Sequence, residues 1–322
     1  MKAEKPWLGV FFLTLSACGG GGGDGSTQKP VSSSFALTSA NAVKAAGASW
    51  QAARTSEDYS DLAGVSGAVI SKPGSSAKLA KSLPSPALLE RLLAKTSVGP
   101  EVLPCEQGGS ITISGELENP LTLTPGDLIS VDANNCDNGV GDVIDGLLEM
   151  TINAFSGDYL SGVYDLSMTL MLKSFQVTTG TDVKSSNGDV TVSLNTMSAT
   201  ALVTGVSGNS LRLDANAESM TLVDFSSAQL LDVSMQPASY TLESSGTLDS
   251  TRLPGSVIYS TPVTFEGTGS SYPHAGEFLV TGEHSSARLV VIDSTSVRID
   301  LDTDGDGVVD EMIETSWAEL DK

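Results

Sequence analysis

The amino-acid sequence predicts a mostly β protein: a large antiparallel, up-and-down sheet, rolled or barrel-like, preceded by a short helical segment. Three observations support this prediction. From Pro104 onward, apolar residues alternate with polar ones, as in strands that bury one face. Turn signals separate the alternating runs. No long helical pattern interrupts residues 105–310, so the crossover helices of a parallel sheet are not expected.

The N-terminal residues have the composition of an export signal and a tether. Two lysines precede a short apolar run, Trp7–Leu15, and small residues then lead into Cys18. This order is typical of a secretory signal segment, here residues 1–17. A membrane-spanning helix needs about 20 apolar residues, so the run is too short to remain across a bilayer. Residues 18–34 are rich in glycine and serine, which is typical of a flexible tether.

Residues 35–98 have a helical pattern and are expected to pack on the sheet that follows. Ser39 is a candidate cap for an alanine-rich helix that runs through Trp50. A second candidate helix covers residues 85–95, with a proline in its first turn and four leucines on one face. Residues 56–76 are weakly patterned, so we expect loops there.

Residues 99–322 are expected to form the β domain. The longest alternating run is Tyr164–Leu172, where every second residue is apolar. Serine, threonine and aspartate fill many positions of the opposite face, which predicts strands that are apolar on the core side only. Shorter runs of the same kind are Ile111–Ile113, Leu121–Leu123, Val190–Leu194, Leu211–Leu213, Met220–Leu222, Tyr240–Leu242, Val263–Phe265 and Val297–Leu301.

Asn187-Gly188 is the strongest turn signal in the β domain. Both residue types tolerate the positive φ angles that a two-residue hairpin loop requires. Gly157-Asp158, Gly208-Asn209 and Pro254-Gly255 are further turn signals. A membrane-spanning barrel would need girdles of aromatic residues, and aromatic residues make up only 5% of the chain, so that architecture is disfavoured.

Cys105 and Cys136 lie in the predicted β domain. An exported chain meets an oxidising compartment, so we expect these two residues to form a disulfide that joins two turns. No histidine lies near them in the sequence, which disfavours a zinc site. The absence of a CxxC pattern disfavours a redox switch.

The formal charge of the chain is −22, with 17 basic and 39 acidic residues. Such a chain has little with which to neutralise phosphates, so nucleic acid is not expected as a partner. The same charge disfavours adsorption on an anionic membrane surface. Cations are the natural small partners of an acidic surface.

The sharpest motif is an acidic stretch near the C-terminus. Acidic residues at every second position allow three side chains to converge on one hard cation, and Gly307 permits the sharp turn that this requires. The stretch resembles the DxDxDG calcium loop of EF-hand, dockerin and thrombospondin-type repeats. The resemblance implies side-chain ligands at Asp302, Asp304, Asp306 and Asp310, with a backbone carbonyl at Val308 as a further ligand.

Two features separate this stretch from an EF-hand. Ile313 occupies the place of the bidentate glutamate, and the preceding Val297–Leu301 alternates like a strand. We therefore expect the loop of a β-hairpin that binds calcium with modest affinity. The alternative is an acidic hairpin turn in which aspartate and glycine serve backbone geometry alone.

The sequence offers no catalytic set, so we predict no catalytic residues and a protein that is not an enzyme. The only histidines are His274, expected in a loop, and His284, expected at a hairpin tip. Neither a GxSxG elbow nor a glycine-rich phosphate loop occurs. Paired carboxylates of a glycoside hydrolase remain open, because acidic residues are plentiful.

Leu15-Ser16-Ala17-Cys18 resembles the lipobox of bacterial lipoproteins. The resemblance implies that Cys18 receives a diacylglycerol thioether and becomes the N-terminus after residues 1–17 are removed. Gly19 stands where an aspartate commonly retains such proteins at the inner membrane, which favours the outer membrane, on its periplasmic or its surface face. An ordinary cleaved signal with an incidental cysteine is the alternative.

These features predict a lipid-anchored cell-envelope protein with a non-enzymatic interaction or structural role. Its expected partners are the membrane, through the anchor, and an envelope protein. One alternative is a carrier that holds an apolar ligand in a half-barrel sheet, because long alternating rows would line a cavity if the sheet stays open. Another is a hydrolase of envelope polysaccharide.

Overall fold

The computed structural model describes residues 34–63, 97–118, 123–137, 139, 141–158, 162–196, 198, 200–269 and 271–322. The predicted signal segment, Cys18, residues 18–33 of the predicted tether, the predicted helix at residues 85–95 and Leu121 of a predicted strand lie outside these ranges.

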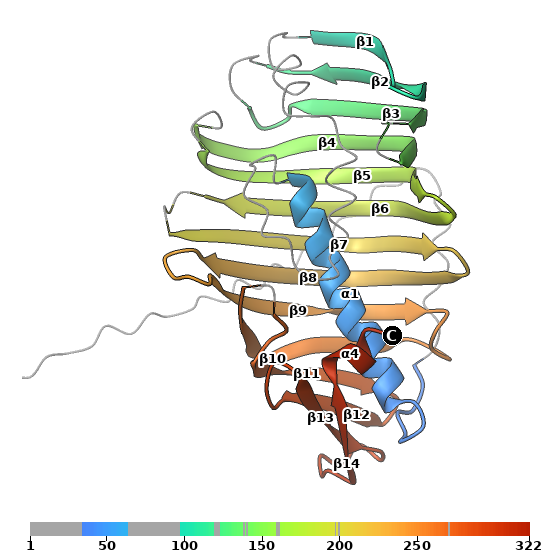
Figure 1. The fold of residues 1–322 in the computed structure, drawn as a ribbon, viewed down its shortest axis with the longest axis vertical. Helices are drawn as coiled ribbons and strands as arrows, with labels where there is room; N and C mark the ends of the chain where they lie inside the picture. Colours follow the sequence, from blue (N-terminus) through green and yellow to red (C-terminus); the bar gives the residue numbers. More distant parts are fainter. Residues whose placement is uncertain are drawn as a thin grey trace, which may run out of the picture. The chain divides into compact units, whose positions relative to one another are not determined.

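The described chain folds into one sheet of 14 strands, each paired antiparallel with the next strand in the sequence. This confirms the predicted up-and-down antiparallel fold, and the sheet is open: β1 and β14 form its two edges (Figure 1). The strands are β1 (Ser97–Pro104), β2 (Gly108–Glu116), β3 (Leu128–Asp137), β4 (Asp142–Asp158), β5 (Val163–Thr179), β6 (Asp182–Asn195), β7 (Ala201–Ala215), β8 (Glu218–Asp232), β9 (Ser239–Ser250), β10 (Val257–Thr268), β11 (Ala275–Gly282), β12 (Ser285–Val291), β13 (Ser296–Asp302) and β14 (Glu311–Ser316).

The prediction of a hairpin turn at Asn187-Gly188 is wrong. Both residues lie inside β6, where the register shifts and Gly188 has φ 136°. The Asn187 side chain accepts a hydrogen bond from the backbone N–H of Ser174 (2.7 Å), itself at a bulge of β5. A β-bulge needs the same positive φ angles as a hairpin turn, so the dipeptide serves either structure. Gly208-Asn209 likewise lies inside a strand, β7.

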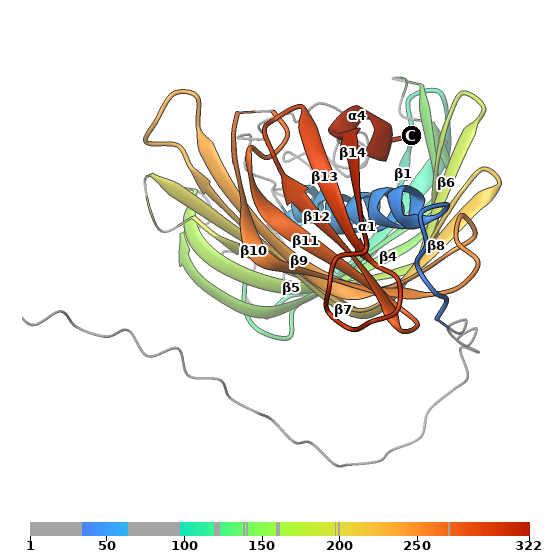
Figure 2. The same cartoon turned by 90° about the horizontal axis from the view of Figure 1, so that it is seen from below.

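Bulges recur in neighbouring strands and bend the sheet. Positive φ angles mark several of these bulges within strands, among them Asn135 in β3, Gly146 in β4, Ser174 in β5 and Asp224 in β8. Each coincides with a shift of the pairing register. Because bulges increase the local twist and bend of a strand, they explain why the sheet curves around a concave side (Figure 2).

Helix α1 (Ala42–Ala63) lies on this concave side and contacts strands β6 to β13. It begins three residues after Ser39, whose hydroxyl donates to Glu311 on β14. It also continues to Ala63, through residues that were expected to form a loop. Within the described part of the chain, no helix combines the length and apolar character needed to cross a bilayer.

The core covers the concave face and includes the buried side chains of α1. The alternating row of β5 points into it, since Tyr164, Leu166, Met168, Leu170 and Leu172 are all buried. The Trp50 ring of α1 lies 5.2 Å from Phe265 and 4.7 Å from Trp317 between ring centroids. A short helix, α4 (Trp317–Leu320), ends the chain against α1.

Val263 departs from the predicted pattern. It was expected to point inward with Phe265, yet it is 49% exposed while Phe265 is buried. The register of β10 shifts on both sides of Val263, so its side chain falls on the outer face. Alternation in the sequence predicts the inward face only where a strand carries no bulge.

Candidate metal centre

The acidic stretch forms the loop between β13 and β14, as predicted for a β-hairpin rather than an EF-hand. β13 ends at Asp302 and β14 begins at Glu311. The backbone N–H of Asp310 donates to the carbonyl of Leu301 (2.8 Å) and closes the base of the loop. The paired strands therefore hold the two ends of the acidic stretch beside one another.

The Asp302 carboxylate organises the loop from within. It is only 7% exposed. Its Oδ1 accepts a hydrogen bond from the Gly305 N–H (2.7 Å), and its Oδ2 accepts one from the Gly307 N–H (3.0 Å). Both glycines have positive φ angles, 77° and 84°, which other residue types rarely adopt. The glycines therefore let the chain fold back around this carboxylate.

Three of the predicted ligands converge. Carboxylate oxygens of Asp302, Asp304 and Asp310 lie within 4.8 Å of one another. Calcium binds oxygen at about 2.3–2.6 Å, so two ligands on opposite sides of the ion are about 4.6–5.2 Å apart. The three oxygens are thus spaced as ligands of one calcium ion. Asp306 stands outside this group, and its carboxylate accepts a hydrogen bond from the Val308 N–H (2.7 Å).

Asp310 is held in its ionised form. Its Oδ2 accepts hydrogen bonds from the hydroxyl (2.5 Å) and the backbone N–H (2.8 Å) of Thr303. These bonds, the hydroxyl first, lower the pKa of Asp310 below the usual value for aspartate. The stabilisation that they give is present at neutral pH and is lost as the pH falls through the lowered pKa. At neutral pH the group is a carboxylate, the form that binds a cation.

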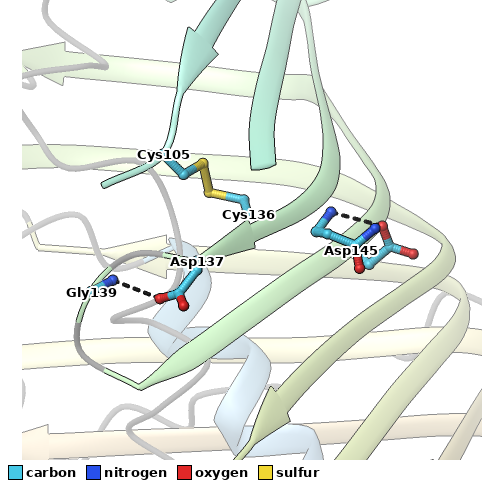
Figure 3. Close-up of a disulfide and its surroundings, with 6 residues drawn as sticks. Cys105, Cys136, Asp137, Gly139 and Asp145 are labelled. Atoms are coloured by element: carbon cyan, nitrogen blue, oxygen red, sulfur yellow. Dashed lines mark hydrogen bonds between the residues drawn. A yellow bond between two sulfur atoms is a disulfide. The ribbon is translucent and has the colours of Figure 1, made fainter. Parts of the chain in front are cut away.

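The predicted disulfide between Cys105 and Cys136 is present, with a Cα–Cα distance of 5.4 Å (Figure 3). Cys105 follows β1, but Cys136 lies inside β3 rather than in a turn. The bulge before Cys136 is fixed by a hydrogen bond from the Asn135 N–H to Asp145 (3.1 Å). The disulfide therefore links the edge of the sheet to its third strand.

The two histidines lie where the sequence predicted. His274 is exposed in the loop that precedes β11, and His284 is exposed at the turn between β11 and β12. The backbone of His284 lies against the acidic loop, since a Cβ built on Gly305 would be 3.1 Å from its carbonyl group. The main chain of the β11–β12 turn thus contacts the acidic loop at Gly305.

One polar cluster had no signal in the sequence. Arg54 of α1 makes an ion pair with Asp321, with Nη1 at 3.0 and 3.1 Å from the two carboxylate oxygens. The Tyr272 hydroxyl donates to the same carboxylate (2.5 Å). Burial, and then the hydrogen bond to Asp321, raise the pKa of Tyr272. Arg54 and Asp321 are 267 positions apart, so no local pattern could have brought them together.

Comparison with protein families, with curated proteins and with solved structures finds no match to this chain.

Proposed function

We propose that this chain is a bacterial cell-envelope lipoprotein with a non-enzymatic structural or interaction role. The observation that carries the proposal is the order of segments along the chain: a basic start with a short apolar run, the lipobox-like Leu15–Cys18, a glycine-rich stretch and a folded β body. A lipid on Cys18 attaches an acidic, water-compatible body to a membrane that its own charge would repel. Gly19 favours the outer membrane as the location.

Replacement of Cys18 tests the anchor directly. In the native host, or in a bacterium that processes lipoproteins, Cys18→Ala is expected to abolish incorporation of labelled palmitate and to move the protein from the membrane fraction to the soluble fraction. The double variant Cys105→Ser/Cys136→Ser is the matched control, because it removes two cysteines and keeps Cys18. Palmitate labelling of the Cys18→Ala variant, or its retention in the membrane, would exclude the proposed anchor.

We further propose that the β13–β14 loop binds one calcium ion through Asp302, Asp304 and Asp310, with the carbonyl of Val308 as an additional ligand. The convergence of three carboxylates supports this proposal. Affinity in the range of extracellular modules, about 10⁻⁴–10⁻³ M, fits a site exposed on one side. Calcium at ten times the dissociation constant is expected to stabilise the fold by about 1.4 kcal/mol. Calorimetry and thermal unfolding, with magnesium for comparison, measure this binding.

A carrier of an apolar ligand is the second candidate function. It is favoured by the continuous apolar face of the open sheet, which includes Phe265, Phe278, Leu289 and Ile299. Over β6 to β13, however, α1 occupies the space that a ligand would take. A carrier built on this fold therefore requires α1 to move.

A further inference from the structure

Helix α1 packs on the concave side over β6 to β13, mainly through alanine methyl groups. Residues 45–50 are buried without interruption, so this part of the helix is enclosed on all sides. Six of its buried side chains are alanine: Ala42, Ala45, Ala46, Ala48, Ala52 and Ala53. An alanine side chain makes few van der Waals contacts, and Trp50 is the one large buried side chain in the described part of the helix. Apart from Trp50, which packs on Phe265, Phe278 and Trp317, the buried side chains in this part of the helix are therefore small.

Two polar atoms of α1 are buried without a hydrogen bond to any described residue, which costs free energy. Among the described residues, the Ser49 hydroxyl and the indole N–H of Trp50 are buried without a hydrogen-bond partner. Both would be hydrated if the helix left the concave side, so their hydration would offset part of the free energy of displacing it.

The C-terminal residues hold α1 from the open side. Leu320 lies against the helix so closely that a Cβ on Gly47 would be 2.6 Å from its carbonyl oxygen. Trp317 packs on Trp50, and the Tyr272 ring stacks on Trp317 at 5.5 Å between centroids. We call Trp317–Asp321 the clasp.

Asp321 is the polar centre of the clasp. It joins Arg54 of α1 to Tyr272, which precedes β11, through the ion pair and the hydrogen bond described above. The side chains of Arg54 and Asp321 are mostly buried, at 19% and 26% exposure. Removal of one partner of such an ion pair destabilises the fold, because the other charge is left buried without compensation.

Helix α1 also accepts a hydrogen bond from a cationic side chain of the sheet region. Arg252, between β9 and β10, donates to the side-chain oxygen of Gln51 (2.8 Å) and lies 3.8 Å from Glu218. When α1 leaves, the bond to Gln51 is lost while Arg252 stays with the sheet. The vacated site would then combine an apolar wall with a guanidinium at its rim.

We propose that α1 is a displaceable plug, released when the clasp opens, and that its site then binds an amphiphile with an acyl chain and an anionic headgroup. The inference rests on the second candidate function and is independent of the lipid anchor. A helix of 22 residues is about 33 Å long, which is enough for an extended acyl chain. The aromatic and aliphatic wall takes the chain, and Arg252 pairs with the headgroup.

The test uses the full chain with Cys18→Ser, so that detergent is not needed, and the fluorescent fatty acid cis-parinaric acid as the probe. Asp321→Asn is expected to speed amide exchange in residues 45–53 by roughly tenfold or more, with β5 unchanged. Binding of the probe should tighten by a similar factor, because the apparent affinity scales with the open fraction. The methyl ester of the probe should bind more weakly than the acid.

Asp300→Asn is the matched control. Arg298 and Asp300 form an ion pair of the same kind on β13, with bonds of 2.6 and 2.9 Å. This variant is expected to change neither exchange in α1 nor probe binding. Tyr272→Phe removes the hydroxyl that donates to Asp321 of the clasp. It should act in the same direction as Asp321→Asn with a smaller effect, so it decides the question if Asp321→Asn does not fold.

Two results would overturn the proposal. If exchange in α1 and in β5 rises together, the helix is an integral part of one cooperative fold and not a plug. If α1 opens but the probe does not bind more tightly, the concave face is not a ligand site. Neither result bears on the lipid anchor, which the Cys18→Ala experiment tests separately.

Discussion

At the scale of single residues, the acidic loop shows how like charges can be held together. The carboxylates of Asp302, Asp304 and Asp310 repel one another. Backbone N–H groups of Gly305 and Gly307 donate to Asp302 and compensate its charge. Thr303 does the same for Asp310. The loop is therefore ordered by its own hydrogen bonds, so calcium would enter a largely formed site.

Substitutions within the loop test the proposed calcium site and the carboxylates assigned to it. Asp304→Asn is expected to weaken calcium binding roughly tenfold or more, because a carboxylate ligand loses its charge. Asp306→Asn should weaken binding by less than about threefold, since Asp306 stands outside the converging group and its amide oxygen still accepts the Val308 N–H. Calorimetry at neutral pH measures both affinities. Equal losses in the two variants would show that the ligand set is wrong.

The sequence predicts the facing of single residues well wherever a strand is regular. The row from Tyr164 to Leu172 is buried as expected. Val263 was placed on the wrong face because a bulge leaves no separate mark in the pattern of apolar and polar residues. For the acidic loop, the motif indicated all four aspartates, and only the geometry separated Asp306 from the other three.

At the scale of elements, the helix on the concave face was predictable and its partners were not. Alanine content indicated a helix near residue 50, and burial on all sides explains why it has no polar face there. Its contact with α4 depends on Gly47, whose missing side chain leaves room for the carbonyl of Leu320. A glycine inside a helix ordinarily lowers its stability, so this one has a packing role.

Gly47→Ala is expected to destabilise the protein, although the same exchange in an exposed helix stabilises it by about 1 kcal/mol. The added Cβ would lie 2.6 Å from the Leu320 oxygen and would force α4 away from α1. A loss of about 1–3 kcal/mol, measured by urea unfolding, is typical of such overpacking.

A truncated chain separates the effect of packing on stability from the effect of helix propensity. In a chain that ends at Glu319, the obstructing carbonyl is absent, and Gly47→Ala should become stabilising. If Gly47→Ala stabilised both chains equally, the contact between α1 and α4 would contribute nothing to stability.

At the scale of the whole molecule, the sheet forms through pairing of strands that are neighbours in the sequence, whereas the N-terminal segment is attached through contacts between distant residues. Every strand pairs with its neighbour in the sequence, so alternation and the lack of crossover helices were sufficient to predict the up-and-down order, although two of the turn signals lie inside strands. Three hydrogen bonds attach residues near α1 to the C-terminal part of the chain. Leu37, Arg54 and Ser39 make them with partners that lie 248, 267 and 272 positions away, respectively. These contacts involve Ser285, Glu311 and Asp321, and no sequence period reports them. Sequence patterns therefore predicted the sheet, and they did not predict the contacts between its C-terminal strands and the segment that contains α1.

This division predicts that the two ends of the sheet respond independently. The disulfide links residues 31 positions apart at β1 to β3, whereas α1 contacts β6 to β13. Cys105→Ser/Cys136→Ser is expected to lower the free energy of opening of β1 to β3 by about 3–4 kcal/mol, from the loop entropy that the disulfide removes.

Hydrogen exchange, resolved by strand, checks this prediction, because it measures the opening of each element separately. Exchange should rise in β1 to β3 and stay unchanged in α1 and in β11 to β13. An equal rise throughout would mean that the 14 strands and the helix unfold as one cooperative unit. In that case a local release of α1 would also be excluded, so the disulfide variant gives a second, independent measurement of whether this long sheet permits one of its parts to open alone.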